Sequence, residues 1–275
     1  MAKIIKDIMA IIEELAPIHL AEAWDNCGLL VGDEKKEVKR LLIALEPSME
    51  VIDEAVEKGI DLIVTHHPLM LNKLNKIISN NVEGRKLIKL IKNDIGLYSA
   101  HTNLDKAPNG LNFYLGRLLK LLDIKVLSPS SGENMHHYNN GLENHLMGLG
   151  VIGLLEKELT LEKLSKAVQR ILGLEYIHFV GDKERVIRTV AIVTGSGISE
   201  LDKAIIKGAE VLITGDIKYH NAQYANEVGI SLIDATHFGS ENIVVKLLGD
   251  IFSKKLKDEV EVLLDQKAQN PIQIL

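Results

Sequence analysis

The chain has 275 residues, of which 46% are hydrophobic and 25% charged, a balance typical of a globular protein and unlike that of a disordered chain. Its formal net charge of −6 argues against a broad basic surface for nucleic acid, which makes such a partner unlikely without excluding a local patch. The single cysteine, Cys27, excludes an internal disulfide and fits a reducing compartment. No apolar run approaches the ~20 residues of a membrane helix, so we expect a cytoplasmic protein without a membrane partner.

The first half of the chain alternates amphipathic stretches with short apolar runs. Apolar residues recur at helical spacing up to residue 15, a pattern unlike that of a signal peptide, and Pro17 ends this predicted helix. Further along, strands are predicted at 41–45, 61–65 and 96–100, with helices at 49–58 and 83–93 between them. Strands and helices that alternate at this spacing indicate βαβ units and a mostly parallel sheet.

The same order of elements returns in the second half. Strands are predicted at 190–194, 211–214 and 231–235, and helices at 200–207 and 221–228. A helix capped by Thr160 and a strand at 176–180 precede them. Five identities lie 149 residues apart, and the third strands match at an offset of 135 (235 − 100): Asp53 and Asp202, Ala55 and Ala204, Lys58 and Lys207, Gly59 and Gly208, Thr65 and Thr214, then Ala100 and Ala235. We interpret this as an internal duplication.

A polar stretch separates the two halves and marks the boundary. It is rich in Ser, Asn, Gly and His between residues 128 and 144. The sequence therefore predicts a first α/β repeat at 1–127, a connecting loop region at 128–147 and a second α/β repeat at 148–275. The adjacent His136 and His137 fall in this loop, where solvation is the expected state.

Metal-binding side chains follow almost every predicted strand. Ligands of a parallel sheet gather beyond the carboxyl ends of its strands, so these side chains are expected at one edge. They are, strand by strand, His66 and His67; His101 and Asp105; Asp216 and His220; His237 and Glu241. Imidazole and carboxylate together suit zinc, iron, manganese, nickel or cobalt. More than four such groups suggest two metal ions, since a carboxylate can bridge a pair. Taken singly, each motif is a weak signal, and for an adjacent pair such as His66-His67 a polar loop around one satisfied core histidine is the commoner explanation.

Two of these histidines, His101 and His220, have more than one interpretation. They could transfer protons, or they could orient metal ligands through hydrogen bonds, and a plain structural role is the third alternative. If a helix begins near Gly239, Glu241 would lie beside His237.

Other motifs give weaker signals. Gly148-Leu-Gly150-Val-Ile-Gly153 matches a dinucleotide pattern, but no strand precedes it and no helix follows directly. The Thr194–Gly197 turn could cradle an anion, although a tight turn is the commoner explanation. In the loop Trp24-Asp25-Asn26-Cys27-Gly28, the tryptophan is either a packing anchor or part of a loop that borders the site, where Asp25 and Asn26 could orient ligands or substrate. Cys27 lacks a neighbouring base that would make it a nucleophile.

Seven of these segments together resemble the family of GTP cyclohydrolase I type 2 homologs, also called the NGG-interacting-factor-three-like family. The resemblance runs along almost the whole chain. It rests on Trp24-Asp-Asn-Cys-Gly28, Thr65-His-His-Pro68, Ser99-Ala-His-Thr-Asn-Leu-Asp105, Gly148-Leu-Gly150 with Gly153, Thr194-Gly-Ser-Gly197, Gly215-Asp-Ile-Lys-Tyr-His220, and Asp234-Ala-Thr-His237 with Glu241. The chain lacks the large insertion between halves of longer relatives, and Glu46 stands where relatives usually carry Asp.

The resemblance implies a fold of two intertwined, duplicated α/β repeats with mostly parallel mixed sheets. It also implies a ring-shaped homohexamer with metal sites that face an interior cavity. The two divalent metal ions, which could be zinc, iron, manganese or nickel, would be held by five ligands with Glu241 as a bridge: His66, His67, Asp105, His237 and Glu241.

Two functions are favoured by the sequence, and a third, nucleic-acid binding through an oligomer's cavity, is weakened by the acidic balance without being excluded. The first is a metal-dependent hydrolase of purine nucleotides or phosphoesters, in which His101 or His220 transfers a proton and the turn at Gly195–Gly197 holds phosphate. The second is a non-catalytic metal-handling or metal-dependent interaction protein. The additional groups His101, His220 and Asp25 favour the hydrolase.

Overall fold

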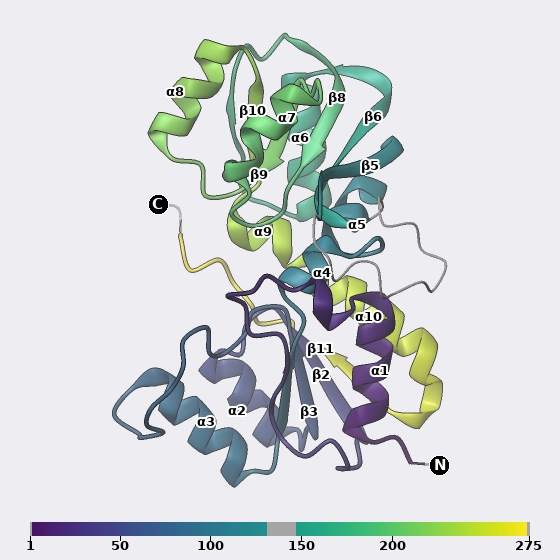
Figure 1. The fold of residues 1–275 in the computed structure, drawn as a ribbon, viewed down its shortest axis with the longest axis vertical. Coiled ribbons are helices and arrows are strands. Elements are labelled where there is room, and N and C mark those ends of the chain that lie inside the picture. Colours follow the sequence, from purple (N-terminus) through teal and green to yellow (C-terminus); the bar gives the residue numbers. More distant parts are fainter. Residues whose placement is uncertain (1, 131–146, 274–275) are drawn as a thin grey trace. The chain divides into compact units, whose positions relative to one another are not determined.

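A computed structural model describes residues 2–130 and 147–273 of the chain (Figure 1). The chain divides into two compact units. Unit 1 comprises Met1–Leu104 and Val244–Leu275, and unit 2 comprises Asp105–Ile243. Among the described residues, no helix is long and apolar enough to cross a membrane. The predicted loop region 128–147, with His136 and His137, falls largely outside the described residues.

Unit 1 is built on a five-stranded sheet in the order β1-β4-β3-β2-β11. β2, β3 and β4 are the predicted parallel strands, and β11 adds a fourth parallel strand beside β2, whereas the edge strand β1 runs antiparallel to β4. Their bounds are β1 Gly28–Val31, β2 Arg40–Ala44, β3 Leu62–Thr65, β4 Gly96–Ser99 and β11 Glu261–Leu264. β2, β3 and β4 are almost wholly buried because helices cover both faces of the sheet.

The helices of unit 1 form two layers (Figure 1). α2 (Met49–Glu57) and α3 (Val82–Lys92) cover one face, where Ile52 and Leu87 pack against Leu42 and Ile63. α1 (Ile5–Leu15) and α10 (Ile243–Leu256) cover the other face. The short 3₁₀ helices are η1 (Ile18–Leu20) and η5 (Lys257–Glu259). The chain passes into unit 2 within α4 (Thr102–Lys106).

Unit 2 is built on a six-stranded mixed sheet in the order β5-β6-β8-β9-β10-β7. β8, β9 and β10 are parallel to one another. β6 runs antiparallel to β8, β7 runs antiparallel to β10, and β5 runs antiparallel to β6. Two apolar clusters lie in this unit, one involving α5 and α6 and the other α7 and α8. The bounds are α5 Leu111–Leu118, β5 Leu122–Pro129, β6 Gly148–Thr160, α6 Leu161–Leu172, β7 His178–Val180, β8 Val186–Ile192, η4 Ile198–Glu200, α7 Leu201–Ile206, β9 Val211–Thr214, α8 Tyr219–Val228, β10 Ser231–Asp234 and α9 His237–Glu241.

Strand positions confirm the internal duplication. β3 and β9 begin and end 149 residues apart (211 − 62 and 214 − 65), and β4 and β10 lie 135 apart (231 − 96 and 234 − 99). Pairing agrees, because Leu41 lies opposite Leu62 in unit 1 and Val190 lies opposite Val211 in unit 2. In each unit an antiparallel edge strand, β1 or β7, flanks the third parallel strand.

The duplication extends to side-chain hydrogen bonds. The Asp61 carboxylate accepts the backbone N–H groups of Lys39 and Arg40, at 2.8 and 2.9 Å. At the same offset of 149 residues, the Glu210 carboxylate accepts those of Arg188 and Thr189, at 2.6 and 2.7 Å. In both copies an acid therefore accepts two successive N–H groups at the start of the first parallel strand.

The compact units and the predicted repeats divide the chain differently. α10 and β11 follow the second repeat in sequence but complete unit 1, where β11 pairs with β2. The domain boundaries 1–127 and 148–275 describe how the sequence was duplicated, and they stay a prediction. The C-terminal segment of the second repeat belongs to unit 1, which agrees with an intertwined fold. The glycine motif at 148–153 lies in the long strand β6. It therefore lacks the strand–turn–helix setting of a dinucleotide loop.

Candidate metal centre

Three histidines of unit 1 meet beyond the carboxyl ends of two neighbouring strands. His66 and His67 follow β3, and His101 follows β4. Because β3 and β4 are parallel neighbours, their ends deliver these side chains to one place. Each imidazole offers a nitrogen within 4.8 Å of the others, and the ring centroids are 5.1 to 5.4 Å apart.

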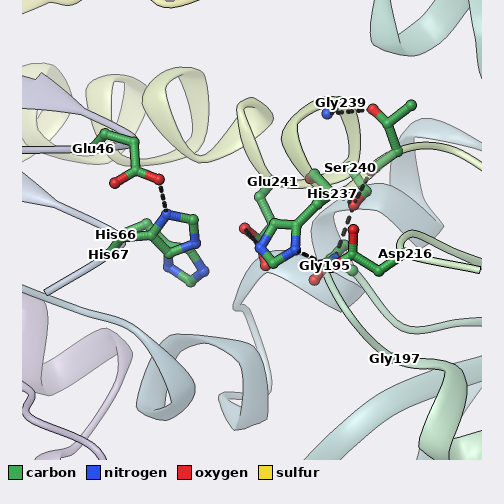
Figure 2. A network of polar contacts seen from close by, with 12 residues as sticks. Glu46, His66, His67, Gly195, Gly197, Asp216, His237, Gly239, Ser240 and Glu241 are labelled. Atoms are coloured by element: carbon green, nitrogen blue, oxygen red, sulfur yellow. Dashed lines mark hydrogen bonds and ion pairs between the residues drawn. The ribbon is translucent and has the colours of Figure 1, made fainter. Parts of the chain in front are cut away.

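Each of these imidazoles is oriented through its Nδ1 atom. Nδ1 of His66 lies 2.8 Å from the carbonyl oxygen of Ala100, and Nδ1 of His67 lies 2.5 Å from Oε1 of Glu46 (Figure 2). Nδ1 of His101 lies 2.9 Å from Oδ1 of Asp25. A carbonyl or carboxylate oxygen only accepts, so Nδ1 carries the proton in each ring. The lone pair of a neutral ring is then on Nε2, which is the arrangement of metal-binding histidines.

Asp25 accepts the hydrogen bonds that fix His101 and the residues around it. Its side chain is fully buried and accepts hydrogen bonds from His101, from the Thr102 N–H and hydroxyl at 3.0 and 2.5 Å, and from the Cys27 thiol at 3.1 Å. Burial alone would raise the pKa of this carboxyl, but the hydrogen bonds from His101, Thr102 and Cys27 hold it well below its ordinary value. Asp25 is therefore a charged, fixed acceptor.

Cys27 belongs to this same support. Burial and the hydrogen bond to Asp25 raise the pKa of its thiol to about 12. A thiol with so high a pKa is not a nucleophile at neutral pH. This agrees with the expectation that Cys27 is not a catalytic group.

In unit 2, His237 and Glu241 form a second group of donors on α9. The helix begins at His237, two residues before the expected start near Gly239, because Thr236 caps it by accepting the Gly239 N–H at 2.9 Å. His237 and Glu241 are four residues apart, so one helical turn places Nε2 2.9 Å from Oε2. Nδ1 of His237 lies 2.7 Å from Oδ2 of Asp216 (Figure 2). This repeats the Nδ1 arrangement of unit 1.

The surroundings of His237 and Glu241 on α9 favour a positive charge on the imidazole. The hydrogen bond to Glu241 is the main cause that raises the pKa of His237 to about 9, with burial opposing it and Asp216 adding to it. Glu241 is almost fully buried, so its charge needs a partner. A metal ion could serve as that partner in place of the proton on His237.

Two glycines allow α9 to sit where it does. Gly195 has φ +65°, and a Cβ on it would collide with the Glu241 carboxylate, while its N–H donates to Oγ of Ser240 at 2.9 Å (Figure 2). A Cβ on Gly215 would lie 2.5 Å from the backbone nitrogen of His237. Thr236 itself has φ +56° and ψ 154°, a conformation of high strain for a residue with a Cβ. Local backbone strain is thus concentrated next to the donor pair.

Asp105 is held from within unit 2. It is 9% exposed and lies on α4, and its carbonyl oxygen accepts from Nδ2 of Asn112 at 3.0 Å. Oδ1 of the buried Asn112 accepts the Thr194 N–H at 2.9 Å. One amide side chain therefore joins the segment of Asp105 to the turn that carries Gly195.

The Thr194–Gly197 turn uses its N–H groups internally. Thr194 donates to Asn112, Gly195 to Ser240, and Gly197 to Oγ1 of Thr214 at 2.9 Å. Three N–H groups that an anion cradle would need are therefore engaged, and the tight-turn interpretation fits better. His220, in contrast, lies exposed in the first turn of α8, where its ring contacts Tyr219. Its role in proton transfer stays a prediction.

The residues present fit a metal. Unit 1 gathers three imidazoles with Nε2 as the lone-pair nitrogen, and unit 2 provides an imidazole and a buried carboxylate, together with Asp105. Nitrogen and oxygen donors of this kind, each oriented by a hydrogen bond to a carboxylate or carbonyl, suit zinc and the other transition metals. A group of histidine and glutamate side chains in this protein could therefore hold metal.

The sequence pointed to Asp25 as a residue that could orient ligands and to Asp216 as a group at a strand end, but it did not reveal that Glu46, Asp25 and Asp216 each accept a hydrogen bond from a histidine Nδ1. Each follows a strand end or borders one in the chain, which was the available signal, but hydrogen-bond partners are not readable from spacing. Glu46 now has an explanation as the acceptor of His67. Its carboxylate reaches the imidazole at 2.5 Å.

Sequence comparison identifies relatives along the whole chain. The family model for Duf34/NIF3 (NGG1p interacting factor 3) matches residues 3–271. A Clostridium perfringens protein named GTP cyclohydrolase 1 type 2 homolog is 38% identical over 271 residues, which cover 98% of this chain and 99% of that protein. A Staphylococcus aureus protein of the same name is 27% identical in an alignment of 353 positions, covering 94% and 96%. That relative carries residues absent from this 275-residue chain, which confirms the compact form.

Solved structures agree. A hypothetical protein of Staphylococcus aureus superposes with a TM-score of 0.90 at 31% identity and covers 100% of both chains. Reduced HcgD from Methanocaldococcus jannaschii superposes with a TM-score of 0.78 at 33% identity, covering 96% of this chain and 98% of that one. The chain therefore belongs to the DUF34/NIF3 (NGG1p interacting factor 3) family.

Proposed function

We propose that this protein binds two divalent metal ions per chain and acts as a metal-dependent hydrolase of the kind named GTP cyclohydrolase 1 type 2 in its relatives. Its substrate is a small molecule, either a purine nucleotide or a phosphoester. The five ligands are those implied by the family resemblance, with Glu241 as the bridge: His66, His67, Asp105, His237 and Glu241. Zinc, iron, manganese and nickel are the candidate metals.

The orientation of the imidazoles is the observation that carries this proposal. His66, His67 and His237 each donate Nδ1–H to an oxygen, at 2.8, 2.5 and 2.7 Å. Two of the three acceptors are carboxylates, which make the ring a stronger base toward a metal. A histidine kept only for packing or solubility has no need of an Nδ1–H oriented in this way.

The chemistry assigned to the chain's own groups follows from their surroundings. Bound metal ions would supply an activated water and stabilise charge on the attacked atom. His101, held by the buried Asp25, would accept a proton at Nε2 and return it to the leaving group. Asp25 stabilises the charged ring during that exchange, since it stays ionised. His220 is the second candidate for this proton transfer.

We further propose that the protein is cytoplasmic and forms a homohexamer. The single, unreactive thiol of Cys27 is suited to a reducing compartment. The hexamer rests on the family resemblance alone. Light scattering on the purified chain tests it, and a monomer would contradict it.

Metal analysis together with turnover tests the function. Elemental analysis would be run on wild type and on the variants His66→Ala, His237→Ala and Glu241→Ala, with His178→Ala, an exposed histidine on β7, as the matched control. We expect close to two metals per chain in wild type and in the control. The three ligand variants should lose metal together with turnover of GTP or of a phosphoester panel.

Each alternative has its own result. Metal loss without any turnover in wild type would favour the metal-handling function. A wild type that stays free of metal after incubation with zinc, manganese, iron or nickel would refute the metal site itself.

A further inference from the structure

The only tryptophan of the chain is exposed beside the histidine cluster of unit 1. Trp24 is 61% exposed, although indole is among the most costly side chains to leave in water. Its ring centroid lies 6.1 Å from that of His101 in an edge-to-face arrangement of 78°. His101 in turn contacts the rings of His66 and His67. The packing-anchor interpretation of Trp24 therefore fails, because most of the indole faces solvent.

The loop that carries Trp24 is fixed on both sides of the ring. Asp25 on one side is the buried hub for His101, Thr102 and Cys27. Asn26 donates from Nδ2 to the carbonyl oxygen of Met70 at 2.7 Å, and its N–H donates to Oδ1 of Asp25 at 2.7 Å. The residues on both sides of Trp24 are thus fixed by hydrogen bonds, while the indole itself faces solvent. An exposed aromatic ring on a fixed loop is a partly preorganised surface for stacking.

We propose that Trp24 is a stacking platform for a planar, nitrogen-containing aromatic ring of the ligand that enters the metal centre. Such a ring has a π-face that packs on indole at little conformational cost. Its ring nitrogens and carbonyl groups would be directed toward the imidazoles beside His101. Sugars, simple phosphoesters and amides lack this face, so the platform selects a heterocyclic base over the other substrates of a metal-dependent hydrolase. This inference rests on the proposed function, whose substrate class it narrows.

The uniqueness of Trp24 makes a direct readout possible. Zinc-loaded full-length protein would be titrated with GTP and with UTP, and the tryptophan emission recorded, since all of it comes from this one ring. Ribose 5-phosphate, which has the sugar and phosphate without a base, is the control ligand. We expect saturable quenching by a nucleotide and unchanged emission with ribose 5-phosphate.

Variants separate stacking from other roles of the ring. By calorimetry, Trp24→Leu should weaken nucleotide binding about 5- to 150-fold, the range for loss of one stacked base, and Trp24→Phe should recover part of it. Phe179→Leu, which removes an exposed aromatic ring on β7, should leave the affinity unchanged. Because Trp24 is exposed, these variants should keep their metal content, which is measured on the same samples.

Three results would overturn the platform. The first is nucleotide binding, seen by calorimetry, with unchanged emission and an unweakened Trp24→Leu variant. The second is the absence of binding of either nucleotide to metal-loaded protein, which leaves the metal function standing. The third is a smaller assembly of Trp24→Leu in light scattering at unchanged nucleotide affinity, which assigns the indole to contact between copies. Quenching in a chain that holds no metal would support the platform while refuting the proposed function.

Discussion

The two units share one scaffold but place different chemistry at equivalent positions. The offset of 149 residues that relates β3 to β9 makes the pair His66-His67 equivalent to Gly215-Asp216 (66 + 149 = 215). It also makes Glu46 equivalent to Gly195. In unit 1 the second strand ends in the candidate metal donors His66 and His67, and the acid after the first strand orients one of them. In unit 2 the second strand ends in the orienting acid, and the donors begin the helix after the third strand.

This difference teaches how a duplicated fold can build one kind of centre in two ways. The strands and their backbone hydrogen bonds are kept, whereas the residues just beyond the strands are free to change. Each unit still pairs an imidazole with a carboxylate through Nδ1. What the two units share is therefore the hydrogen bond from a histidine Nδ1 to a carboxylate, and not the position of either residue in the repeat.

The largest effect is expected at Gly195, where unit 2 has no side chain and unit 1 has Glu46. Gly195→Ala should abolish metal binding by α9, because the new Cβ would displace the Glu241 carboxylate. Gly208→Ala is the matched control, since Gly208 also has a positive φ, +79°, but no atom within 4 Å of the added Cβ. We expect the control to cost about 1–2 kcal/mol of unfolding free energy and to keep its metal. Equal metal content in both variants would refute the cradle at Gly195.

The orienting acids allow the two units to be compared directly. Glu46→Gln and Asp216→Asn each replace a charged acceptor by a neutral amide of the same shape. Each should weaken metal binding about 10- to 100-fold, the usual cost of losing such a partner. Competition with a metal-chelating dye measures this. An unchanged affinity in one variant alone would mean that this unit's acid is not a functional partner of its histidine.

Buried asparagines provide a comparison of stability. Asn112→Asp in unit 2 places an oxygen against the Asp105 carbonyl, and Asn103→Asp in unit 1 does the same against the carbonyl of Ala16, 2.7 Å away. Both side chains are buried, so each change should cost about 1–3 kcal/mol in chemical denaturation. A negligible loss at Asn112 would show that it does not hold the segments of Asp105 and Gly195 together.

The smallest effect concerns pH in metal-free protein. The pKa of His237 is raised to about 9 by Glu241, so the charged pair contributes stability that is complete below the ordinary value of 6.5 and is lost as pH rises through about 9. The melting temperature of metal-free wild type should therefore fall over this window, and that of Glu241→Gln should fall less. Parallel melting curves of the two proteins would contradict the pairing.

Much of the fold was predictable from local pattern. The six parallel strands of the two repeats, β2 to β4 and β8 to β10, alternate with helices and are buried, so apolar runs revealed them. β11 was missed because its partner β2 lies 221 residues away (261 − 40), and no local signal reports such a pairing. β6 was missed because glycines at its start resembled a loop, although antiparallel partners on both sides hold it extended.

The site was predictable to the level of residue type. Strand ends identified the candidate donors, but the expected single edge is two: His66, His67 and His101 follow strands of the unit 1 sheet, whereas His237 and Glu241 follow a strand of the separate unit 2 sheet. The acceptors Glu46, Asp25 and Asp216 required the direction of side chains, which depends on the packing of each loop. Gly195 looked like part of an anion cradle, and only the contacts of its N–H and of its missing Cβ show that it accommodates Glu241.

The late return of the chain to unit 1 has a consequence for biosynthesis. The ribosome delivers β2, β3 and β4, with His66, His67 and His101, long before β11 emerges to pair with β2. Unit 2 is continuous in sequence and can fold while its neighbour still waits for that strand. Until then the β2 edge is open to pairing with other chains. A chain truncated before residue 261 would thus carry the histidine cluster on a sheet that lacks β11. We expect such a chain to be degraded rather than loaded with metal.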